Sequence, residues 1–367
     1  MPSDRSATRP ALLLLVGLLA SAIALAGCGL PLISTDGASP ATEGFVRQDG
    51  TQLAVGGQPY RFEGLNIFQA ASHGTCGGTL DLKEALHKID HGQTVFRAWF
   101  FQAFVVRHGQ FDWVPFDKLL ADAAARHERV IVTLGNEYNY CDGPQKDLVW
   151  WQTGYRTKVY PGDLVTYRQW VADIVARYKD NPTIAIWQLV NEGSAVSPGN
   201  SCSESAALAA MKAFAKNVGG LVKSIDSNHL VSLGDIPGGC GSYGVDYETL
   251  NAVRYLNVCD YHDYSYPGVP MGSPGINGLA MSIQYCHADR KPIMVAETGI
   301  LVTSPSMLRT RAKEFAAKFA AQFQAGVVGE LMWSWVKAPT YVVPPTAADF
   351  GIAPRDPALR VLASPSD

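Results

Sequence analysis

The feature that most constrains the fold is an eightfold alternation of short apolar runs with longer amphipathic stretches. The runs expected to form strands are 61–66, 94–100, 130–136, 184–191, 230–234, 255–262, 292–297 and 328–334. Between them, apolar side chains recur at three- and four-residue spacing, which is typical of helices. The clearest helical stretches are 115–126, 164–178, 206–225 and 306–325. This order favours parallel strands with crossover helices, either closed as a barrel or open and doubly wound.

Nothing along this alternation divides it into domains. No stretch repeats internally, and no long polar break separates the strand–helix units. Residues 44–57 predict a β-hairpin before the first unit, with turns at Asp49-Gly50 and Gly56-Gly57. We therefore predict an α/β fold, a single (β/α)8 TIM barrel over residues 44–367 with a short N-terminal β-hairpin.

Composition excludes two broad classes of protein. Of the 367 residues, 47% are hydrophobic, which suffices for a large core and excludes disorder over most of the chain. The formal net charge is −3, so there is no basic surplus to contact phosphates. A general nucleic-acid binder is therefore excluded.

Residues 1–27 predict a secretory leader. Arg5 and Arg9 precede an apolar run, Ala11 to Ala26, that is short for a transmembrane helix and ends in small residues. The sequence Leu25-Ala26-Gly27-Cys28 resembles the lipobox of bacterial lipoproteins, in which the cysteine is lipidated; the alternative is an ordinary leader with an accidental cysteine. We expect an exported lipoprotein, facing the cell surface or periplasm, anchored to the membrane through Cys28 with residues 28–43 as a flexible tether.

The other cysteines suit an oxidising compartment because they are even in number. They are Cys76, Cys141, Cys202, Cys240, Cys259 and Cys286. Six cysteines allow fifteen pairings, so sequence does not determine the connectivity. Proximity along the chain favours Cys202–Cys240 and Cys259–Cys286, which leaves Cys76–Cys141. None has the CxxC spacing of a zinc or redox site.

Reactive side chains follow the predicted strands where each one ends. The fourth strand ends at Asn191-Glu192 and the seventh at Glu297. Other strand ends carry Arg97, Trp99, Asn136, His262, Tyr264, Trp333 and Trp335. Since the carboxyl ends of barrel strands meet on one face, where active sites form, we expect these side chains to lie together.

Two carboxylates on one face suit the cleavage of a glycosidic bond. One carboxylic acid protonates the leaving oxygen, and one carboxylate attacks or stabilises the oxocarbenium-like centre. Burial and a neighbouring negative charge favour the protonated acid, and a close arginine favours an ionised nucleophile. Aromatic faces bind the apolar faces of sugars, while amide and imidazole groups bind hydroxyls.

These residues resemble the site pattern of clan A glycoside hydrolases, particularly family 5, and the resemblance covers about residues 44–340. It implies a retaining mechanism with Glu192 as acid and then base, and Glu297 as nucleophile. It further implies that Asn191 binds the 2-hydroxyl of the sugar, and that Arg97 and Tyr264 hold Glu297 ionised.

The resemblance also assigns the remaining strand-end residues. His262 hydrogen-bonds near Glu192, and Trp333 forms the floor of the central subsite. Trp335 competes with Trp333 for that position, because alternation along a strand would place both on one face. Trp99 and Asn136 are expected to contact substrate as well.

Two stretches narrow the resemblance to plant- and fungal-type β-mannanases. Phe45 to Thr51, followed by Tyr60 to Asn66, is similar to the start of those enzymes. Val132 to Tyr138, continuing to Gly143, is similar to their Asn-rich loop. Many family 5 cellulases end the third strand with a histidine, which this chain lacks, and this departure favours the mannanase-like branch.

Several other motifs could suggest a different catalytic, cofactor or metal site, but each is weaker evidence than the paired glutamates. Asn136-Glu137 repeats the Asn-Glu dipeptide, but we interpret Glu137 as a substrate-pocket or structural residue rather than the acid. Gly239 to Gly244 matches GxGxxG, yet it starts well after its strand, contains a candidate disulfide cysteine and has no clear helix after it. We interpret His73, His87 and His91 as surface histidines rather than metal ligands. No GxSxG elbow of a serine hydrolase is present.

The sequence therefore predicts a monomeric retaining glycosidase of β-linked polysaccharide, with β-1,4-mannan as the leading substrate and no cofactor or metal. The alternatives are an endo-β-1,4-glucanase or other β-hexan hydrolase on the same fold and, from another class, a surface lipoprotein that binds glycan without cleaving it. Linkage and endo or exo action are not determined by the sequence.

Overall fold

The computed structural model describes residues 44–72, 76, 82–89, 94–265, 268–337 and 350–362. The predicted leader, Cys28 and the tether lie outside the described residues. Within them, no helix combines the length and the apolar character that crossing a membrane requires.

Eight parallel strands form the central barrel, in the spatial order β10-β9-β8-β5-β4-β13-β12-β11. They are β4 (Phe62–Asn66), β5 (Thr94–Trp99), β8 (Arg129–Thr133), β9 (Ile184–Gln188), β10 (Leu230–Ser232), β11 (Cys259–Asp263), β12 (Ile293–Thr298) and β13 (Gly329–Met332). The amides of Asn257 and Val258, just before β11, donate to the carbonyl of Val231 in β10 and join the two edges. All eight predicted strands are present, and the predicted TIM barrel is confirmed.

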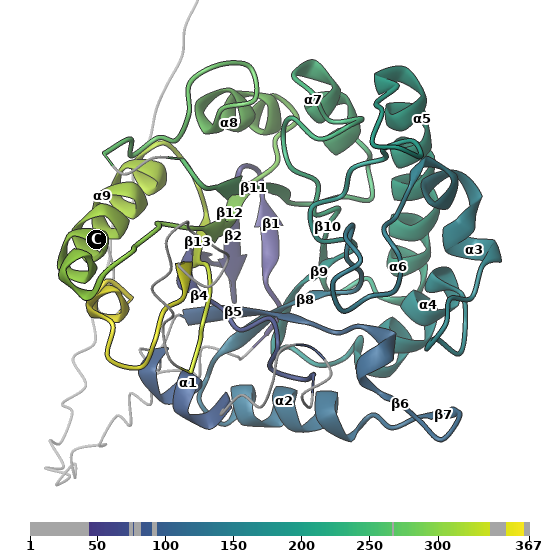
Figure 1. Ribbon diagram of the computed structural model, residues 1–367, viewed down its shortest axis with the longest axis horizontal. Coiled ribbons are helices and arrows are strands. Elements are labelled where there is room, and N and C mark those ends of the chain that lie inside the picture. Colours follow the sequence, from purple (N-terminus) through teal and green to yellow (C-terminus); the bar gives the residue numbers. More distant parts are fainter. Residues whose placement is uncertain are drawn as a thin grey trace, which may run out of the picture. The chain divides into compact units, whose positions relative to one another are not determined.

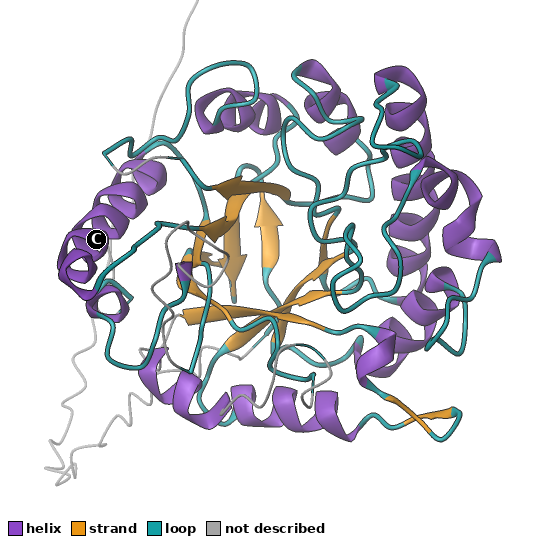
Figure 2. Cartoon of the chain, in the orientation of Figure 1, coloured by secondary structure: helices purple, strands orange, loops and turns teal. Residues whose placement is uncertain are grey.

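Helices surround these strands, as Figure 1 and Figure 2 show. They are α1 (Leu82–Ile89), α2 (Val114–Ala124), α3 (Tyr155–Thr157), α4 (Tyr167–Tyr178), α5 (Glu204–Phe214), α6 (Gly220–Ile225), α7 (Val245–Asn251), α8 (Leu279–Ala288) and α9 (Leu308–Gln324). Shorter helical turns are η1 (Gln102–Phe104), η2 (Trp150–Gly154), η3 (Ala215–Gly219), η4 (Pro305–Met307) and η6 (Pro357–Arg360).

Three helical segments depart clearly from the sequence expectation. The predicted helix 164–178 begins only at Tyr167, because the Thr166 hydroxyl accepts a hydrogen bond from the Gln169 amide and caps the helix. The predicted helix 206–225 is α5 and α6 joined by the π-helical turn η3. Helix α7 follows the loop 239–244, where no helix was expected.

The predicted hairpin is the first part of a three-stranded antiparallel sheet, β1 (Arg47–Asp49), β2 (Gln52–Val55) and β3 (Gln58–Tyr60). Its buried Leu53 and Tyr60 belong to the same hydrophobic cluster as Val95 and Ala185, which lie near the starts of barrel strands. The sheet therefore covers the amino end of the barrel and leaves the carboxyl end for a site. A further small hairpin, β6 (Val106–Arg107) with β7 (Gln110–Phe111), follows β5.

Three disulfides join loops and elements of the barrel, in the pairing that proximity along the chain favoured. Cys76–Cys141, Cys202–Cys240 and Cys259–Cys286 have Cα separations of 5.5, 5.7 and 6.4 Å. The first two tie together loops that follow barrel strands.

Candidate active site

Glu192 and Glu297 meet at the carboxyl end of the barrel. Glu297 is the fifth residue of β12, and Glu192 follows β9 by four residues. A carboxylate oxygen from each and a ring nitrogen of His262, in β11, all lie within 4.8 Å of one another. This separation suits retaining enzymes, whose carboxyl groups are about 5–5.5 Å apart, rather than inverting enzymes at about 6.5–9.5 Å.

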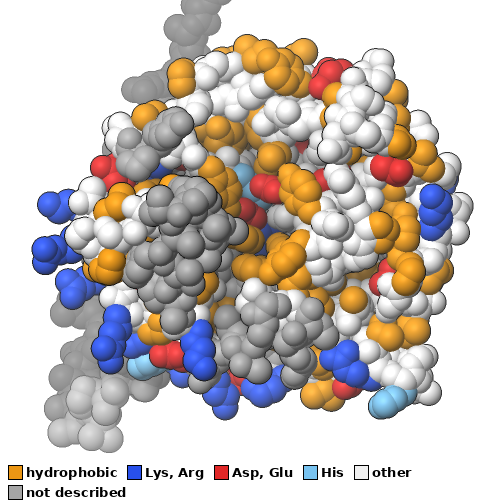
Figure 3. Space-filling model, viewed as in Figure 1, with side chains coloured by type: hydrophobic (Ala, Val, Ile, Leu, Met, Phe, Trp, Pro, Cys, Tyr) orange, Lys and Arg blue, Asp and Glu red, His pale blue; other side chains and the backbone are white. Residues whose placement is uncertain are grey.

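A cavity of about 290 Å³ opens over these carboxylates. It is lined by Trp99, Asn136, Tyr138, Tyr140, Asn191, Glu192, Tyr264, Glu297, Trp333 and Phe350. Figure 3 shows acidic side chains and histidine at the base of a hollow bordered by hydrophobic side chains. A larger groove of about 420 Å³ lies between α9 and η6, but among the described residues Glu63 is the only acid that lines it, so it lacks the paired carboxylates.

Glu297 accepts two hydrogen bonds and lies close to His262. Arg97 Nη1 lies 2.7 Å from Oε1, and the Tyr264 hydroxyl donates to Oε2 at 2.6 Å. His262 Nδ1 is 3.3 Å from the same Oε2. Burial raises the pKa of Glu297 above its ordinary value, although His262 and Arg97 act in the opposite direction.

Arg97 is itself fixed by side chains from β4, from β9 and from the segment that follows β9. Its Nε donates to Gln188 Oε1 at 2.8 Å, its Nη1 donates to Asn66 Oδ1 at 3.0 Å, and its Nη2 donates to Asn191 Oδ1. Because these hydrogen bonds already fix the guanidinium group, it loses little conformational freedom when it also binds a carboxylate. Arg97 therefore holds the Glu297 carboxylate and orients Asn191 at once.

Glu192 lies in a different backbone environment. Its φ of 51° is in the left-handed region, which costs a non-glycine residue about 1–3 kcal/mol. Its side chain is 20% exposed, and Oε1 lies 2.9 Å from His262 Nδ1. Burial raises the pKa of Glu192, but the hydrogen bond and charge of His262, the charge of Arg97 and a hydrogen bond from Tyr138 together outweigh it, so the net direction is downward.

These pKa directions differ from the simple expectation of a raised acid and a lowered nucleophile. Burial is the largest influence on both carboxyl groups and raises both pKa values, but at Glu192 the hydrogen bonds and nearby positive charges together reverse the direction. Burial lowers the pKa of His262, but Glu297 and Glu192 together raise it above its ordinary value. Because the three groups lie so close, they titrate as one unit. His262 Nδ1 is one hydrogen bond away from Glu192.

Most of the predicted site residues come together. Arg97 and His262 contact the two carboxylates, while Trp99, Asn136, Asn191, Tyr264 and Trp333 line the cavity. Trp335 does not line it: the side chain is buried, with 3% exposed, and its backbone N–H donates to Asn66. The expectation that Trp335 competes with Trp333 assumed strand alternation, but β13 ends at Met332, so the alternation does not reach residue 335.

An aromatic wall beside the carboxylates is formed by Phe68, Trp99, Tyr140 and Trp333. The sequence predicts only the two tryptophans. Phe68 stacks on Trp333 at 4.9 Å between centroids and lies 4.6 Å from Trp99. Tyr140 packs against Trp99 at 6.0 Å. Phe68, Tyr138 and Tyr140 were not singled out from the sequence, although Tyr138 and Tyr140 stand two and four residues after Asn136, where alternation could have indicated them.

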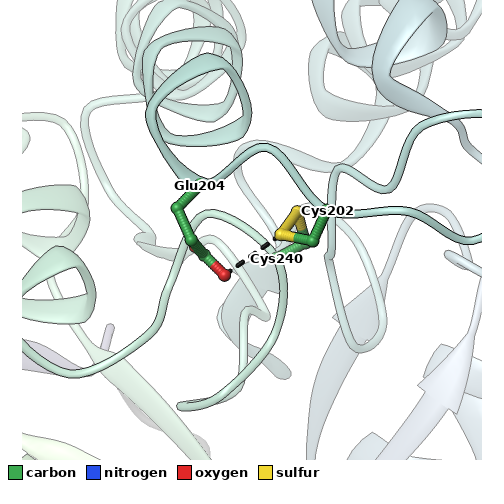
Figure 4. A group of neighbouring side chains, drawn as sticks. All are labelled: Cys202, Glu204 and Cys240. Atoms are coloured by element: carbon green, nitrogen blue, oxygen red, sulfur yellow. Dashed lines mark hydrogen bonds between the residues drawn. A yellow bond between two sulfur atoms is a disulfide. The ribbon is translucent and has the colours of Figure 1, made fainter.

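Among the described residues, two groups bring three metal-ligating side chains together. Glu192, His262 and Glu297 form the site itself, where Arg97 already supplies a cation 2.7 Å from Glu297. In the other group, Cys202 and Cys240 are joined in a disulfide beside Glu204, so neither sulfur is a thiolate (Figure 4). His87 is exposed on α1, while His73 and His91 lie outside the described residues.

The chain is similar to known mannan-degrading proteins over most of its length. It is 25% identical over 304 residues to mannan endo-1,4-beta-mannosidase 1 of Arabidopsis thaliana, covering 70% of this chain and 72% of that protein. No protein-family model matches the chain.

Solved structures share the fold. The endo-1,4-beta-mannanase of Rhizomucor miehei superposes with a TM-score of 0.62 at 20% identity, covering 87% of this chain and 97% of that one. The glycoside hydrolase family 5 mannosidase of the same organism gives 0.61 at 18% identity, covering 88% and 96%.

Fold and paired carboxylates together match one class of protein: the chain folds as a (β/α)8 barrel and carries the carboxylate pair that retaining glycoside hydrolases use. Within that class, the predicted resemblance to the mannanase branch of glycoside hydrolase family 5 is confirmed.

Proposed function

We propose that the protein is a retaining β-mannanase that cleaves β-1,4-linked mannan by double displacement. The observation that carries the proposal is the approach of Glu192, His262 and Glu297 to within 4.8 Å at the base of an aromatic-walled cavity. The mannan substrate is supported by the curated relative, whose name assigns it that activity.

In the first step, Glu297 attacks the anomeric carbon while Glu192 protonates the departing glycosidic oxygen, which leaves a glycosyl–enzyme ester. In the second, Glu192 takes a proton from water, the water oxygen bonds to the anomeric carbon, and the Glu297 carboxylate leaves. Arg97 and Tyr264 donate hydrogen bonds to the Glu297 carboxylate. They hold its oxygens while the negative charge of the carboxylate is lost and regained.

Asn191 is set to bind the 2-hydroxyl of the reacting sugar. Its Oδ1 is occupied by Arg97, and one Nδ2 hydrogen donates to Asn136 Oδ1 at 2.9 Å. An amide carries two such hydrogens, so one remains to donate to the substrate. Stacking on the aromatic wall binds the apolar face of the sugar ring.

The experiment is a polysaccharide panel with product sizing. Purified protein is incubated with linear mannan, carboxymethylcellulose and mixed-linkage glucan, and reducing ends and product lengths are followed. Mannan cleavage whose first-formed NMR signal is the β-anomer supports the proposal. Preferred release from the glucans supports the endoglucanase alternative, and binding without turnover on any glycan supports a non-catalytic lectin-like role.

We further propose that the mature chain is a monomeric, exported lipoprotein anchored through acyl chains on Cys28. The support is the sequence Leu25-Ala26-Gly27-Cys28 after an apolar run. A labelled fatty acid should enter the wild-type protein expressed in bacteria, and Cys28→Ser should abolish both labelling and membrane association. Light scattering of the protein from residue 44 onward tests the monomer.

A further inference from the structure

The second Asn-Glu dipeptide lies directly beside the first. Asn136 and Asn191 form a parallel bridge where the paths of β8 and β9 continue past the strand ends. The Glu137 amide donates to the Asn191 carbonyl at 3.0 Å, and the Asn191 amide donates to Gly135 at 2.7 Å. Glu137 is therefore bonded to the residue immediately before Glu192.

The Glu137 side chain contacts the chain again just after Glu192. It is 1% exposed, and its Oε2 accepts from the Ser194 amide at 3.4 Å and from the Trp151 indole at 3.2 Å. The far edge of the Trp151 ring lies against Gly193, where a Cβ would stand 2.9 Å from the ring. Glu137 and Trp151 thus contact residues 191, 193 and 194, on both sides of Glu192.

Such support is needed because Glu192 has a left-handed backbone that a glutamate rarely adopts, with φ at 51°. Residues in such conformations persist only where their surroundings over-determine them. We propose that Glu137 is a positioning residue: with Trp151 it fixes residues 191–194 and so aims the Glu192 carboxyl at the glycosidic oxygen. This inference rests on the proposed function of Glu192 as acid and base.

Glu137 does this as a neutral group. Burial raises its pKa to about 9, although Ser194, Trp151, Lys146 and Gln145 act in the opposite direction. A glutamine has the same shape and keeps an acceptor for Trp151 and Ser194. Glu137→Gln is therefore the conservative variant, and Glu137→Ala removes the acceptor.

Two substrates distinguish a misplaced Glu192 carboxyl from a general loss of active-site structure. Mannan has a poor leaving group that needs protonation, whereas a 2,4-dinitrophenyl β-mannobioside releases dinitrophenolate without it. For Glu137→Ala and for Trp151→Phe we expect kcat on mannan to fall about 10–100-fold, the cost of misplacing a reacting group by roughly 1 Å. The initial burst of dinitrophenolate should stay within about threefold of wild type.

The steady-state rate on the dinitrophenyl substrate supplies a second readout. It should fall in both variants, because release of the glycosyl–enzyme needs Glu192 as base. Azide needs no base to attack that ester, so added azide should restore the rate and yield the glycosyl azide. Glu137→Gln should behave like wild type in each assay.

Trp187→Phe is the matched control. Trp187 lies in β9, the strand that leads to Glu192, and its indole donates to the buried carboxylate of Asp226 at 2.8 Å. Losing this bond should lower the melting temperature without changing the ratio of rates on the two substrates.

Equal losses of the burst and of mannan turnover in Glu137→Ala and Trp151→Phe would overturn the inference, and so would wild-type rates on both substrates. A wild-type protein that releases neither sugar nor dinitrophenolate would instead overturn the proposed function, and the inference with it.

Discussion

The two Asn-Glu dipeptides have the same chemistry, the same position at a strand end and neighbouring strands, yet their glutamates have different surroundings. Both asparagines line the cavity. Glu192 also lines it and hydrogen-bonds His262, whereas Glu137 is buried behind it against Trp151. The divergence begins at the backbone: Glu192 has a positive φ, which Glu137 does not share.

The electrostatic consequences differ as well. Burial raises the pKa of Glu137 to about 9, and its donors Trp151 and Ser194 are uncharged. Burial acts on Glu192 too, but His262, Arg97 and Tyr138 together outweigh it and lower the pKa. The two glutamates therefore differ in backbone direction and in hydrogen-bond partners, although the dipeptide is the same.

The loss of activity on replacing Glu297 is the reference for variants of both dipeptides, because the proposed reaction cannot start without its nucleophile. Glu297→Gln should lower kcat on mannan by more than about 10⁴-fold, the order of loss when a nucleophile is removed. Arg97 keeps Asn66 as an acceptor in this variant, so the fold should survive. Activity within tenfold of wild type, measured by reducing-end release on a protein with a wild-type circular dichroism spectrum, would show that the nucleophile is another residue.

The same substitution in the two dipeptides tests their difference directly. Glu192→Gln should lower kcat on mannan about 10²–10⁴-fold, the usual contribution of a general acid–base group. Glu137→Gln should stay within about threefold of wild type, because the amide keeps its acceptor for Trp151 and Ser194. A larger loss in Glu137→Gln than in Glu192→Gln would mean that Glu137 is the acid and Glu192 the supporting residue.

Removing His262 should make the environment of Glu192 more like that of Glu137. Burial is the largest influence on the pKa of both Glu192 and Glu297 and raises it, while His262 lowers both. In His262→Asn both pKa values therefore rise. The kcat/KM profile needs one of the two carboxyl groups ionised and the other protonated, and its two limbs report the pair as a unit. Because both pKa values rise, both limbs move to higher pH.

We expect His262→Asn to lose about 10–100-fold in kcat/KM at the wild-type optimum. Profiles of wild type, His262→Asn and the control Trp187→Phe on mannan measure the shift. Limbs that stay in place, or that move toward lower pH, contradict the role of His262 in lowering the pKa of both carboxyl groups.

The residues whose location at the carboxyl end of the barrel could be predicted from the sequence lie inside strands or close to their ends. Glu297 lies within β12, and Arg97 lies within β5, so strand periodicity and barrel geometry together locate them. The burial of Glu137 and the exposure of Glu192 depend on one backbone torsion and on Trp151, which is 14 residues distant from Glu137. No local pattern carries that information.

Trp333 and Trp335 are also two identical residues close together in the sequence, of which one lines the cavity and the other is buried. Trp333 stacks on Phe68 in the cavity wall, and Trp335 is buried behind it. Trp335→Phe should cost about 1–3 kcal/mol of stability through lost packing and leave KM and kcat on mannan unchanged. Trp333→Phe should keep stability and raise KM, because the sugar loses part of its stacking surface. Thermal melts and steady-state kinetics on both variants measure this, and a KM effect confined to Trp335→Phe would place the sugar against the other indole.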